Sequence, residues 1–383
     1  MIHKKIFYLI SGLVKKLLFW FASQKKIGPA QKTIHIVRLD TIGDFVLFST
    51  ILSYFRKLYP GHKIVLIVDG VVSGLADWVN KQRVLGGESN YFDEIIAIDG
   101  KQYNRNFFYY YAILKKIRLS APKIVIQPTF SRTPKSDEIV FISKEAQKIA
   151  YEGDFSNIAT RRKEKNNAKY SRLIKNPMVI SEPEINKHFI NELAGYQIEP
   201  AGLPQWEISQ ELKVKMKQKL ESLGIDFSKP LITVCPGASR PIKTWPAEHF
   251  ISLIKKLHET KPVFQFLLAG GPKEKELCLD VQKTLGMKNV YDICGQLTLP
   301  ELAATLSFAV LYIGNDTGAM HIACAVGVSA VGIVAGEHGT RFFPYPAWKE
   351  GAQNRAVFNK TGGIGVADIT VEDVLGEVLD ILH

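Results

Sequence analysis

The sequence predicts an α/β protein built from two doubly wound domains that face a central cleft. From Thr33 onward, short apolar runs alternate with stretches of helical spacing, and this alternation occurs as two separate series along the chain. The 383 residues, of which 46% are hydrophobic, suffice for two domains with cores of their own. Ligands of such sheets bind at the carboxyl ends of the strands, so we expect the site in the turns that follow them.

The two series predict strands and helices in a definite order. Buried parallel strands of the first series are expected at residues 34–37, 64–68, 95–98 and 124–126, with a helix over residues 45–58 that ends at Pro60-Gly61. The second series predicts strands at 231–235, 264–269, 290–293, 310–313 and 330–334, separated by helices at 247–259, 273–285, 299–306 and 318–327. Pro200, Gly202 and Pro204 indicate a hinge, which divides the chain into domains at residues 31–204 and 205–383.

Residues 1–30 differ from the rest of the chain. Their apolar segment is interrupted by Gly12 and Lys15-Lys16, so it is too short for an uninterrupted membrane-spanning helix, and it lacks the small residues of a signal-peptide cleavage site. Lysines flank the segment on both sides. This pattern favours a basic amphipathic helix that lies on an anionic membrane surface, with Trp20 and Phe21 in the acyl boundary. A helix docked on the protein's own core stays the alternative.

The net charge of +12 favours an anionic partner: nucleic acid, an acidic membrane surface or a phosphorylated substrate. The sequence has no nucleic-acid recognition motif, so nucleic acid is not expected. A basic stretch from Arg161 to Lys175 is interpreted either as a solvated loop or as a mobile arm that meets an anionic acceptor. The four cysteines lie in or beside apolar segments without a CxxC pair, which predicts buried free thiols in a reducing compartment.

The most informative turn runs from Gly314 to His321, between two apolar runs. That order is typical of a strand, a tight polar turn and a helix. Asn315, Asp316 and Thr317 place short polar groups beside a helix N-terminus, where free N–H groups and the helix dipole favour an anion. The turn predicts a phosphate-binding site, with an ordinary capped turn as the alternative. His321 either reaches that phosphate or packs as a satisfied buried histidine.

A second polar turn, Arg38 to Asp44, follows the first predicted strand. Gly43 lets the backbone come close to a ligand, and Asp44 stands where the helix starts, facing the predicted cleft. A carboxylate there can accept the proton of an attacking hydroxyl. The alternative is that Asp44 or Asp40 simply caps the helix.

Two further turns follow strands of the second series. In one, Lys243 can neutralise a phosphate while the Gly237–Ser239 backbone donates N–H groups to it. Lys243 is otherwise just one of 49 Lys and Arg residues. In the other turn, Glu274 either accepts hydrogen bonds from a ribose or is a first-turn glutamate that favours the helix dipole.

Several motifs are absent from the sequence. No GxGxxG follows a predicted strand, which disfavours a nicotinamide dinucleotide fold, and the lack of GxxxxGK[ST] excludes the usual NTPase cradle. No His, Cys and Asp cluster has metal-ligand spacing along the chain. We therefore expect no cofactor and no metal.

These four turns, in this order and spacing, resemble those of glycosyltransferase family nine, the ADP-heptose:lipopolysaccharide heptosyltransferases. The resemblance covers about Thr33 to Pro346 and rests jointly on R-L-D-T-I-G-D, P-G-A-S-R-P-I-K-T-W-P and G-N-D-T-G-A-M-H. It implies a GT-B fold of two Rossmann-like domains, with the acceptor on the N-terminal domain and the sugar nucleotide mainly on the C-terminal one. It also implies an inverting, metal-independent transfer.

The same resemblance implies roles for particular residues. Asp44 matches the catalytic base, Lys243 the pyrophosphate-binding lysine, and Glu274 the ribose-binding acid, with Glu276 as a near competitor. The complete predicted donor site comprises Gly237, Ser239, Lys243, Glu274, Asp316, Thr317, Gly318 and His321. The sequence departs from the family pattern at Ser49-Thr50, Ser329 and Ala335-Gly336, which leaves the identity of the donor open.

The expected partners are a sugar nucleotide donor (ADP-heptose), a lipopolysaccharide or glycolipid acceptor and an anionic membrane surface. The expected location is cytoplasmic, peripheral on the inner face of the bacterial inner membrane. Three alternatives stay open: transfer of another sugar for O-antigen or capsule, a nucleotide-sugar epimerase on the same architecture, and an inactive membrane-bound scaffold. Asp44, Lys243 and Asp316 are all present, which argues against the scaffold.

Overall fold

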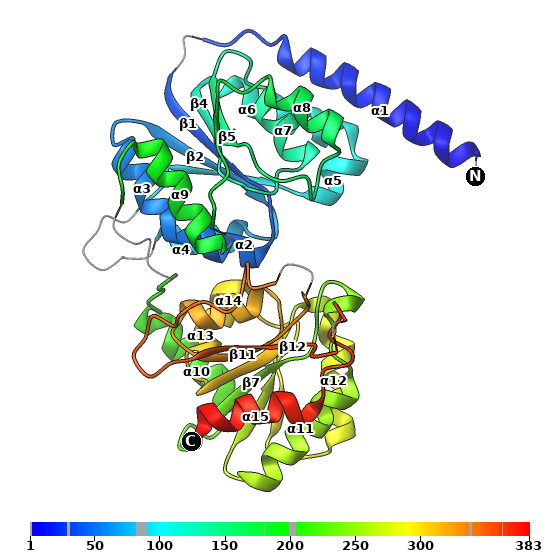
Figure 1. The fold of residues 1–383 in the computed structure, drawn as a ribbon, viewed down its shortest axis with the longest axis vertical. Coiled ribbons are helices and arrows are strands. Elements are labelled where there is room, and N and C mark those ends of the chain that lie inside the picture. The colour runs from blue at the N-terminus through cyan, green and yellow to red at the C-terminus, as the bar shows by residue number, and fades with distance from the viewer. Residues whose placement is uncertain are drawn as a thin grey trace.

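The computed structural model describes residues 2–28, 31–81, 90–179, 181–198, 204–336, 339–361 and 363–383. These residues form two α/β domains, stacked one above the other in Figure 1, and each domain contains a parallel six-stranded sheet between layers of helices. The predicted fold class is therefore confirmed.

The sheet of the first domain has the strand order β3-β2-β1-β4-β5-β6. Its strands are β1 (Gln31–Arg38), β2 (Lys63–Asp69), β3 (Glu94–Ile98), β4 (Pro122–Gln127), β5 (Gln147–Tyr151) and β6 (Arg172–Ile174). In the register, Ile34 of β1 lies opposite Ile64 of β2 on one side and Ile124 of β4 on the other. Helices cover both faces, which is why the central strand β2 is a continuous apolar run from Ile64 to Val68 rather than an alternating one.

The helices of the first domain connect these strands and precede them. They are α1 (Ile2–Ser23), α2 (Ile42–Phe48), α3 (Leu52–Leu58), α4 (Ser73–Asn80), α5 (Gly100–Arg105), α6 (Phe107–Leu119), α7 (Pro134–Phe141), α8 (Thr160–Asn167) and α9 (Glu182–Ala194). The helix predicted over residues 45–58 is split by the short 3₁₀ helix η1 (Ser49–Ile51). There the hydroxyls of Ser49 and Thr50 donate to the carbonyls of Val46 and Leu47, a back-bonding that bends helices.

The second domain repeats the plan with the strand order β12-β11-β10-β7-β8-β9. Its strands are β7 (Leu231–Cys235), β8 (Gln265–Leu268), β9 (Val290–Asp292), β10 (Leu311–Asn315), β11 (Ser329–Val334) and β12 (Asn354–Phe358). Its helices are α10 (Gln210–Ser222), η2 (Pro241–Lys243), α11 (Ala247–Thr260), η3 (Pro272–Glu274), α12 (Lys275–Leu285), α13 (Leu299–Leu306), α14 (Gly318–Ala325) and α15 (Val371–Leu382). All four cysteines are buried and free, as predicted.

Some elements escaped the sequence analysis. Strands β5, β6 and β12 lie at or near sheet edges and are short or carry several polar residues. The basic stretch from Arg161 to Lys175 is neither a solvated loop nor a mobile arm, because it contains α8 and β6. Lys163 is only 2% exposed, and its ammonium donates to the carbonyls of Gly153 and Asp154. Tertiary hydrogen bonds therefore decide the structure of a segment whose composition suggests a loop.

Helix α1 runs along the outer side of the first domain, remote from the second domain (Figure 1). One face packs on the domain: Leu18, Phe19 and Ala22 join its core, and Lys15 Nζ donates to the carbonyl of Tyr103 at 3.0 Å. The other face exposes about half of each of its large apolar side chains: Ile10, Leu13, Leu17, Trp20 and Phe21. Among the described residues, no helix has the length and apolar character needed to cross a bilayer.

The two domains touch where the N-termini of α2 and α14 meet. A Cβ on Gly43 would lie 2.6 Å from His321 Cδ2, and a Cβ on Gly318 would lie 2.6 Å from Ile42 Cγ2. Glycine is therefore required at both positions for this approach. The predicted domain boundary lies between residues 204 and 205. The adjacent residues 199–203, which include Pro200 and Gly202, lie outside the described part of the chain. The boundary and the hinge remain predictions.

Candidate active site

Each sheet has a point where its strand order reverses, and the polar turns gather at both points. In the second domain this point lies between β7 and β10, so the turns after these two strands are neighbours. In the first domain it lies between β1 and β4. Crevices at such switch points are where open α/β sheets bind their ligands.

In the second domain, Lys243 and Asp316 meet across the switch point. Lys243 Nζ donates to Asp316 Oδ2 at 2.5 Å, and the two side chains are only 15% and 10% exposed. Asn315 joins the same two turns, because its amide nitrogen donates to the Pro236 carbonyl at 2.8 Å and its amide oxygen accepts from the Trp245 N–H at 3.0 Å. These bonds hold the lysine of one turn beside the helix N-terminus of the other.

That helix is α14, whose first turn starts at Thr317 and Gly318. Thr317 is the N-cap residue, and its side chain makes no capping bond, so the first N–H groups of α14 are not satisfied by it. Free N–H groups and the helix dipole attract an anion to such an end. Lys243 adds a positive charge beside it, which is paired with Asp316. The arrangement suits a phosphate-bearing ligand.

Glu274 lies against three glycines of two neighbouring turns. A Cβ on Gly237 would lie 2.1 Å from Glu274 Cγ, and one on Gly271 would lie 2.9 Å from Glu274 Oε2. The glutamate therefore packs directly on the backbone of the turns after β7 and β8. Glu276, the other candidate, is exposed on α12, so the position of Glu274 suits contact with a ligand in this crevice better. Ser239 is exposed near the same turns.

His321 occupies the contact between the domains. The ring is 3% exposed and stacks on Tyr345, whose hydroxyl lies 3.1 Å from His321 Nδ1, and Nε2 lies 3.8 Å from Asp316 Oδ1. Burial lowers the pKa of the imidazole, while the nearby Asp316 and Asp44 carboxylates oppose that shift. A neutral imidazole is thus packed between the two turns that carry these carboxylates, as the packing alternative expects, and its contact with a phosphate stays a prediction.

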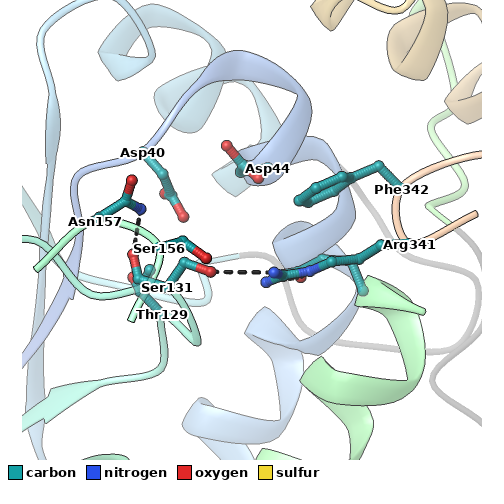
Figure 2. A pocket seen from close by; sticks show the side chains of 9 residues that line it. Asp40, Asp44, Thr129, Ser131, Ser156, Asn157, Arg341 and Phe342 are labelled. Atoms are coloured by element: carbon teal, nitrogen blue, oxygen red, sulfur yellow. Dashed lines mark hydrogen bonds and ion pairs between the residues drawn. The ribbon is translucent and has the colours of Figure 1, made fainter. Parts of the chain in front are cut away.

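Asp44 both closes the first turn of a helix and lines a cavity. Its Oδ2 accepts from the Thr41 N–H at 3.1 Å and from the Thr41 hydroxyl at 2.6 Å, which closes the first turn of α2. Asp44 also lines a cavity at the switch point of the first domain (Figure 2). The capping contact fixes the carboxylate in place without removing it from the cavity.

This cavity has a volume of about 150 Å³ and is built by both domains. Its lining consists of Asp40, Asp44, Thr129, Ser131, Ser156, Asn157, Glu182, Arg341 and Phe342. Arg341 enters from the second domain and donates to Glu182 Oε2 at 2.9 Å and to the Ser131 hydroxyl at 3.1 Å (Figure 2). The pair between Arg341 and Glu182 therefore joins the two domains at the cavity wall.

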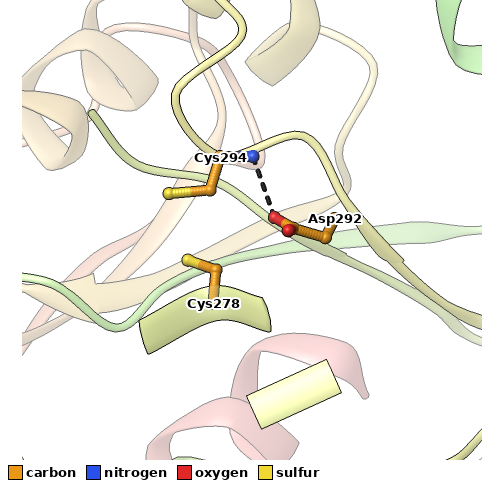
Figure 3. A group of neighbouring side chains, drawn as sticks. All are labelled: Cys278, Asp292 and Cys294. Atoms are coloured by element: carbon orange, nitrogen blue, oxygen red, sulfur yellow. Dashed lines mark hydrogen bonds between the residues drawn. The ribbon is translucent and has the colours of Figure 1, made fainter. Parts of the chain in front are cut away.

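In a third group of side chains, the possible ligand atoms lie close enough together to coordinate one metal ion. The ligand atoms of Cys278, Asp292 and Cys294 lie within 4.8 Å of one another (Figure 3). The sequence showed no metal spacing here, because only the fold brings α12 and β9 together. Asp292 Oδ1 accepts from the Cys294 N–H at 2.9 Å, and Cys294 Sγ donates to the Gly271 carbonyl at 3.5 Å. These contacts tie β9 to the turn after β8, so a structural role accounts for the group.

With this geometry in view, the chain was compared with known proteins. The model of glycosyltransferase family 9 (heptosyltransferase) matches residues 134–359, more than half of the chain. The chain belongs to glycosyltransferase family 9. The matched region includes the turns of Lys243, Glu274 and Asp316, whereas the turn of Asp44 precedes it.

Relatives of this family-9 chain include heptosyltransferases of several bacteria. Lipooligosaccharide heptosyltransferase 2 of Campylobacter jejuni is 28% identical over 36% of this chain and 44% of its own length. Lipopolysaccharide core heptosyltransferase OpsX of Haemophilus influenzae is 23% identical over 82% of each chain. The match to the first of these relatives thus spans less than half of its length.

Solved structures with the same fold cover nearly the whole family-9 chain. The glycosyl transferase family 9 protein from Veillonella parvula has a TM-score of 0.70 at 19% identity, covering 93% of this chain and 99% of its own. The E. coli heptosyltransferase WaaC with ADP-2-deoxy-2-fluoro heptose has a TM-score of 0.63 at 16% identity, covering 91% and 99%. Both support the two-domain Rossmann-like GT-B fold.

Sequence reasoning missed most of the cavity wall of this family-9 chain. Thr129 and Ser131 follow β4, Ser156 and Asn157 follow β5, and Glu182 begins α9. None of them belongs to a motif. The one available signal was position, because polar residues after the apolar strand at 124–126 belong to the same switch point as Asp44.

Proposed function

We propose that this chain is an inverting, metal-independent glycosyltransferase that moves a sugar, best heptose from ADP-heptose, onto a lipopolysaccharide or related glycolipid. One observation carries the proposal: the pair of Lys243 and Asp316 at the N-terminus of α14 lies across the domain contact from Asp44 and its cavity. Sugar transfer needs an anion site for the departing nucleotide and a carboxylate that can accept the proton of the acceptor hydroxyl. The names of the relatives and of the WaaC complex support heptose and ADP as the donor groups.

The leaving group of such a transfer carries the developing negative charge. When the bond between the anomeric carbon and the pyrophosphate oxygen breaks, its electron pair stays on the departing ADP. Lys243 and the N–H groups at Thr317 and Gly318 stabilise that charge, and they are already in place before the reaction. The crevice beside Glu274 takes the ribose.

The attacking group is a hydroxyl of the acceptor. Asp44 accepts its proton while the acceptor oxygen bonds to the anomeric carbon from the face opposite the leaving ADP, and this inverts the configuration. The hydrogen bonds from Thr41 keep Asp44 directed at one position. His321 packs between the two half-sites, where burial lowers its pKa, and it positions the two turns.

A screen of sugar nucleotides tests the proposal. ADP-heptose and other ADP-, UDP- and GDP-sugars are measured for thermal stabilisation and for release of the nucleotide, with and without lipopolysaccharide acceptor. We expect ADP-heptose to bind and to release ADP only when acceptor is present. Release from another sugar nucleotide would point to O-antigen or capsule synthesis. Turnover without acceptor would favour an epimerase, and no binding at all would favour an inactive scaffold.

We also propose that α1 holds the enzyme on the anionic cytoplasmic face of the bacterial inner membrane. The exposed apolar side chains recur at three- and four-residue spacing, so they form one stripe, and Lys16, Lys25 and Lys26 are exposed beside it. Phe108, on the adjacent helix α6, is 89% exposed. Apolar residues flanked by lysines on one side of a molecule suit the boundary between acyl chains and anionic headgroups.

Changing Leu17 and Trp20 together to glutamate tests this placement. Both side chains are about half exposed, so the variant should fold, while the stripe loses its two central groups. We expect binding to vesicles that contain phosphatidylglycerol to fall at least about tenfold, since each apolar side chain buried at an interface contributes roughly 1 kcal/mol or more. Co-sedimentation measures the bound fraction.

Val263→Glu is the matched control, because Val263 is 50% exposed on the second domain. It should bind vesicles like the unchanged protein. Equal binding by the α1 variant and the control would show that α1 serves only the packing of its own domain.

A further inference from the structure

The cavity beside Asp44 has unsatisfied hydrogen-bonding groups in its wall. Thr129 is 8% exposed, and its hydroxyl has no hydrogen-bond partner among the described residues. Asp40 Oδ1 is buried and likewise unpartnered there. Buried polar groups are nearly always hydrogen-bonded, so these two point to a ligand that supplies the missing partners.

The positive charges of the wall are already paired. Arg341 donates to Glu182 Oε2 at 2.9 Å and to Asp154 Oδ2 at 3.3 Å. Arg38, which is 2% exposed and does not line the cavity, lies 2.8 Å from Asp40 and 3.3 Å from Glu182, while its Nη1 has no hydrogen-bond partner among the described residues. A ligand anion would have to displace one of these carboxylates to reach a guanidinium.

The wall therefore has more negative than positive charge. Asp44 adds a further carboxylate, whose hydrogen bonds come from Thr41 rather than from a cation. Burial, together with the nearby Asp44 and Glu182 carboxylates, raises the pKa of Asp40 to about 7 against the opposing effect of Arg38. Near neutral pH the Asp40 carboxyl can then donate as well as accept, which suits a hydroxyl partner.

The size of the cavity matches a single ring. Its volume of about 150 Å³ is that of an engineered protein cavity that holds one benzene molecule. Of the remaining lining residues, Ser131, Ser156 and Asn157 are neutral and polar and Phe342 is apolar, so none of them favours either charge.

We infer that this cavity binds a neutral, hydroxyl-rich sugar ring of the acceptor and rejects a ring that bears a carboxylate or a phosphate. The inference rests on the proposed glycosyltransferase function and names the chemistry of its acceptor. Hydroxyl groups fill the vacant positions at Thr129 and Asp40, whereas an added anion meets the Asp44 and Glu182 carboxylates, and the cation of the described wall, Arg341, is already paired with Glu182 and Asp154. Such like-charge contacts are how binding sites reject wrong partners.

Transfer to two matched acceptors tests the inference. Both are core lipopolysaccharides truncated to a terminal heptose, and in one of them that heptose carries a phosphate. With the donor identified in the screen, kcat/KM for the neutral acceptor should exceed that for the phosphorylated one at least about tenfold. Equal or better transfer to the phosphorylated acceptor overturns the inference and leaves the transferase function intact.

Thr129→Val tests whether the acceptor sugar binds in this cavity. The change removes a hydroxyl that has no partner among the residues that the structure describes, so thermal stability should stay the same or rise. KM for the neutral acceptor should rise about three- to tenfold, the range expected for one lost hydrogen bond, while donor affinity is unchanged. Thr305→Val is the matched control, because the Thr305 hydroxyl is likewise buried and without a partner among the described residues but lies in α13 of the second domain.

A binding measurement without donor separates this inference from the proposed function. Saturation-transfer NMR with methyl heptoside and its phosphate reports on the cavity even in a protein that transfers nothing. Binding of the neutral glycoside that is weakened by Thr129→Val but not by Thr305→Val supports the inference. Absence of binding by the neutral glycoside, or preference for the phosphate, overturns it.

Discussion

Asp44→Asn is expected to lower the rate of sugar transfer at least about a hundredfold while donor affinity stays the same. Asparagine has the same shape, and its side-chain oxygen can still accept from the Thr41 N–H that now lies 3.1 Å from Asp44 Oδ2. The first turn of α2 is therefore preserved. What disappears is the group that takes the proton of the acceptor hydroxyl. Initial rates with saturating acceptor, and calorimetry with the donor, measure the two quantities.

A matched capping residue serves as the control for Asp44. Asp99 Oδ1 accepts from the N–H groups of Lys101 and Gln102 at the start of α5, in the same domain but outside the cavity. Asp99→Asn should leave the rate unchanged. Full activity in a folded Asp44→Asn variant would assign Asp44 to capping alone, and the proposed mechanism would then need another base.

Lys243→Met should weaken the binding of ADP and of the sugar nucleotide by about thirtyfold or more. Methionine keeps most of the side-chain volume and removes the charge. The variant loses the proposed pair between Lys243 and a phosphate of the donor. Loss of one partner from a largely buried charge pair costs about 2 kcal/mol or more of binding free energy, and each 1.4 kcal/mol corresponds to about a factor of ten in affinity. Lys243 is 15% exposed beside Asp316, so solvent screens its charge weakly. Calorimetry with ADP gives the affinity directly.

Thermal unfolding separates loss of binding from loss of structure in this variant. Lys256→Met removes a lysine of the same domain that pairs with Glu372 on the exposed surface. Exposed pairs of this kind contribute little, so its ADP affinity should match that of the unchanged protein. If Lys243→Met binds ADP as tightly as this control, Lys243 belongs to the packing of the turns and not to the donor site.

Local patterns explain why much of the fold could be read from the sequence. Apolar runs such as 64–68 and 231–235 are long and uniform because both faces of a parallel sheet are covered, and they became β2 and β7 with little change at their ends. Strands β5 and β6 were missed, because residues near the edge of the sheet carry polar side chains and their pairing is decided by neighbouring strands. The burial of Lys163 could not be predicted from local sequence either, since it depends on hydrogen bonds to the carbonyls of Gly153 and Asp154.

The same distinction between local patterns and contacts of distant segments applies to the candidate site. Lys243, Glu274, Asp316 and Asp44 lie in turns directly after strands, where sequence position alone predicts proximity to the switch points. Their proposed roles await the tests above. Position after a strand also applied to Thr129 and Ser131, but the closure of the cavity could not be predicted, because Arg341 and Ser131 are 210 residues apart and come from different domains.

Two doubly wound α/β domains, with four polar turns at the ends of their strands, could be predicted from the sequence. These features depend on hydrophobic period and turn chemistry, which act over a few neighbouring residues. Tertiary packing accounts for the cavity that Thr129, Glu182 and Arg341 enclose beside Asp44, and for the way α1 packs on one face and exposes the other. Contacts between distant segments depend on how the domains and helices pack together, and no local pattern encodes that packing.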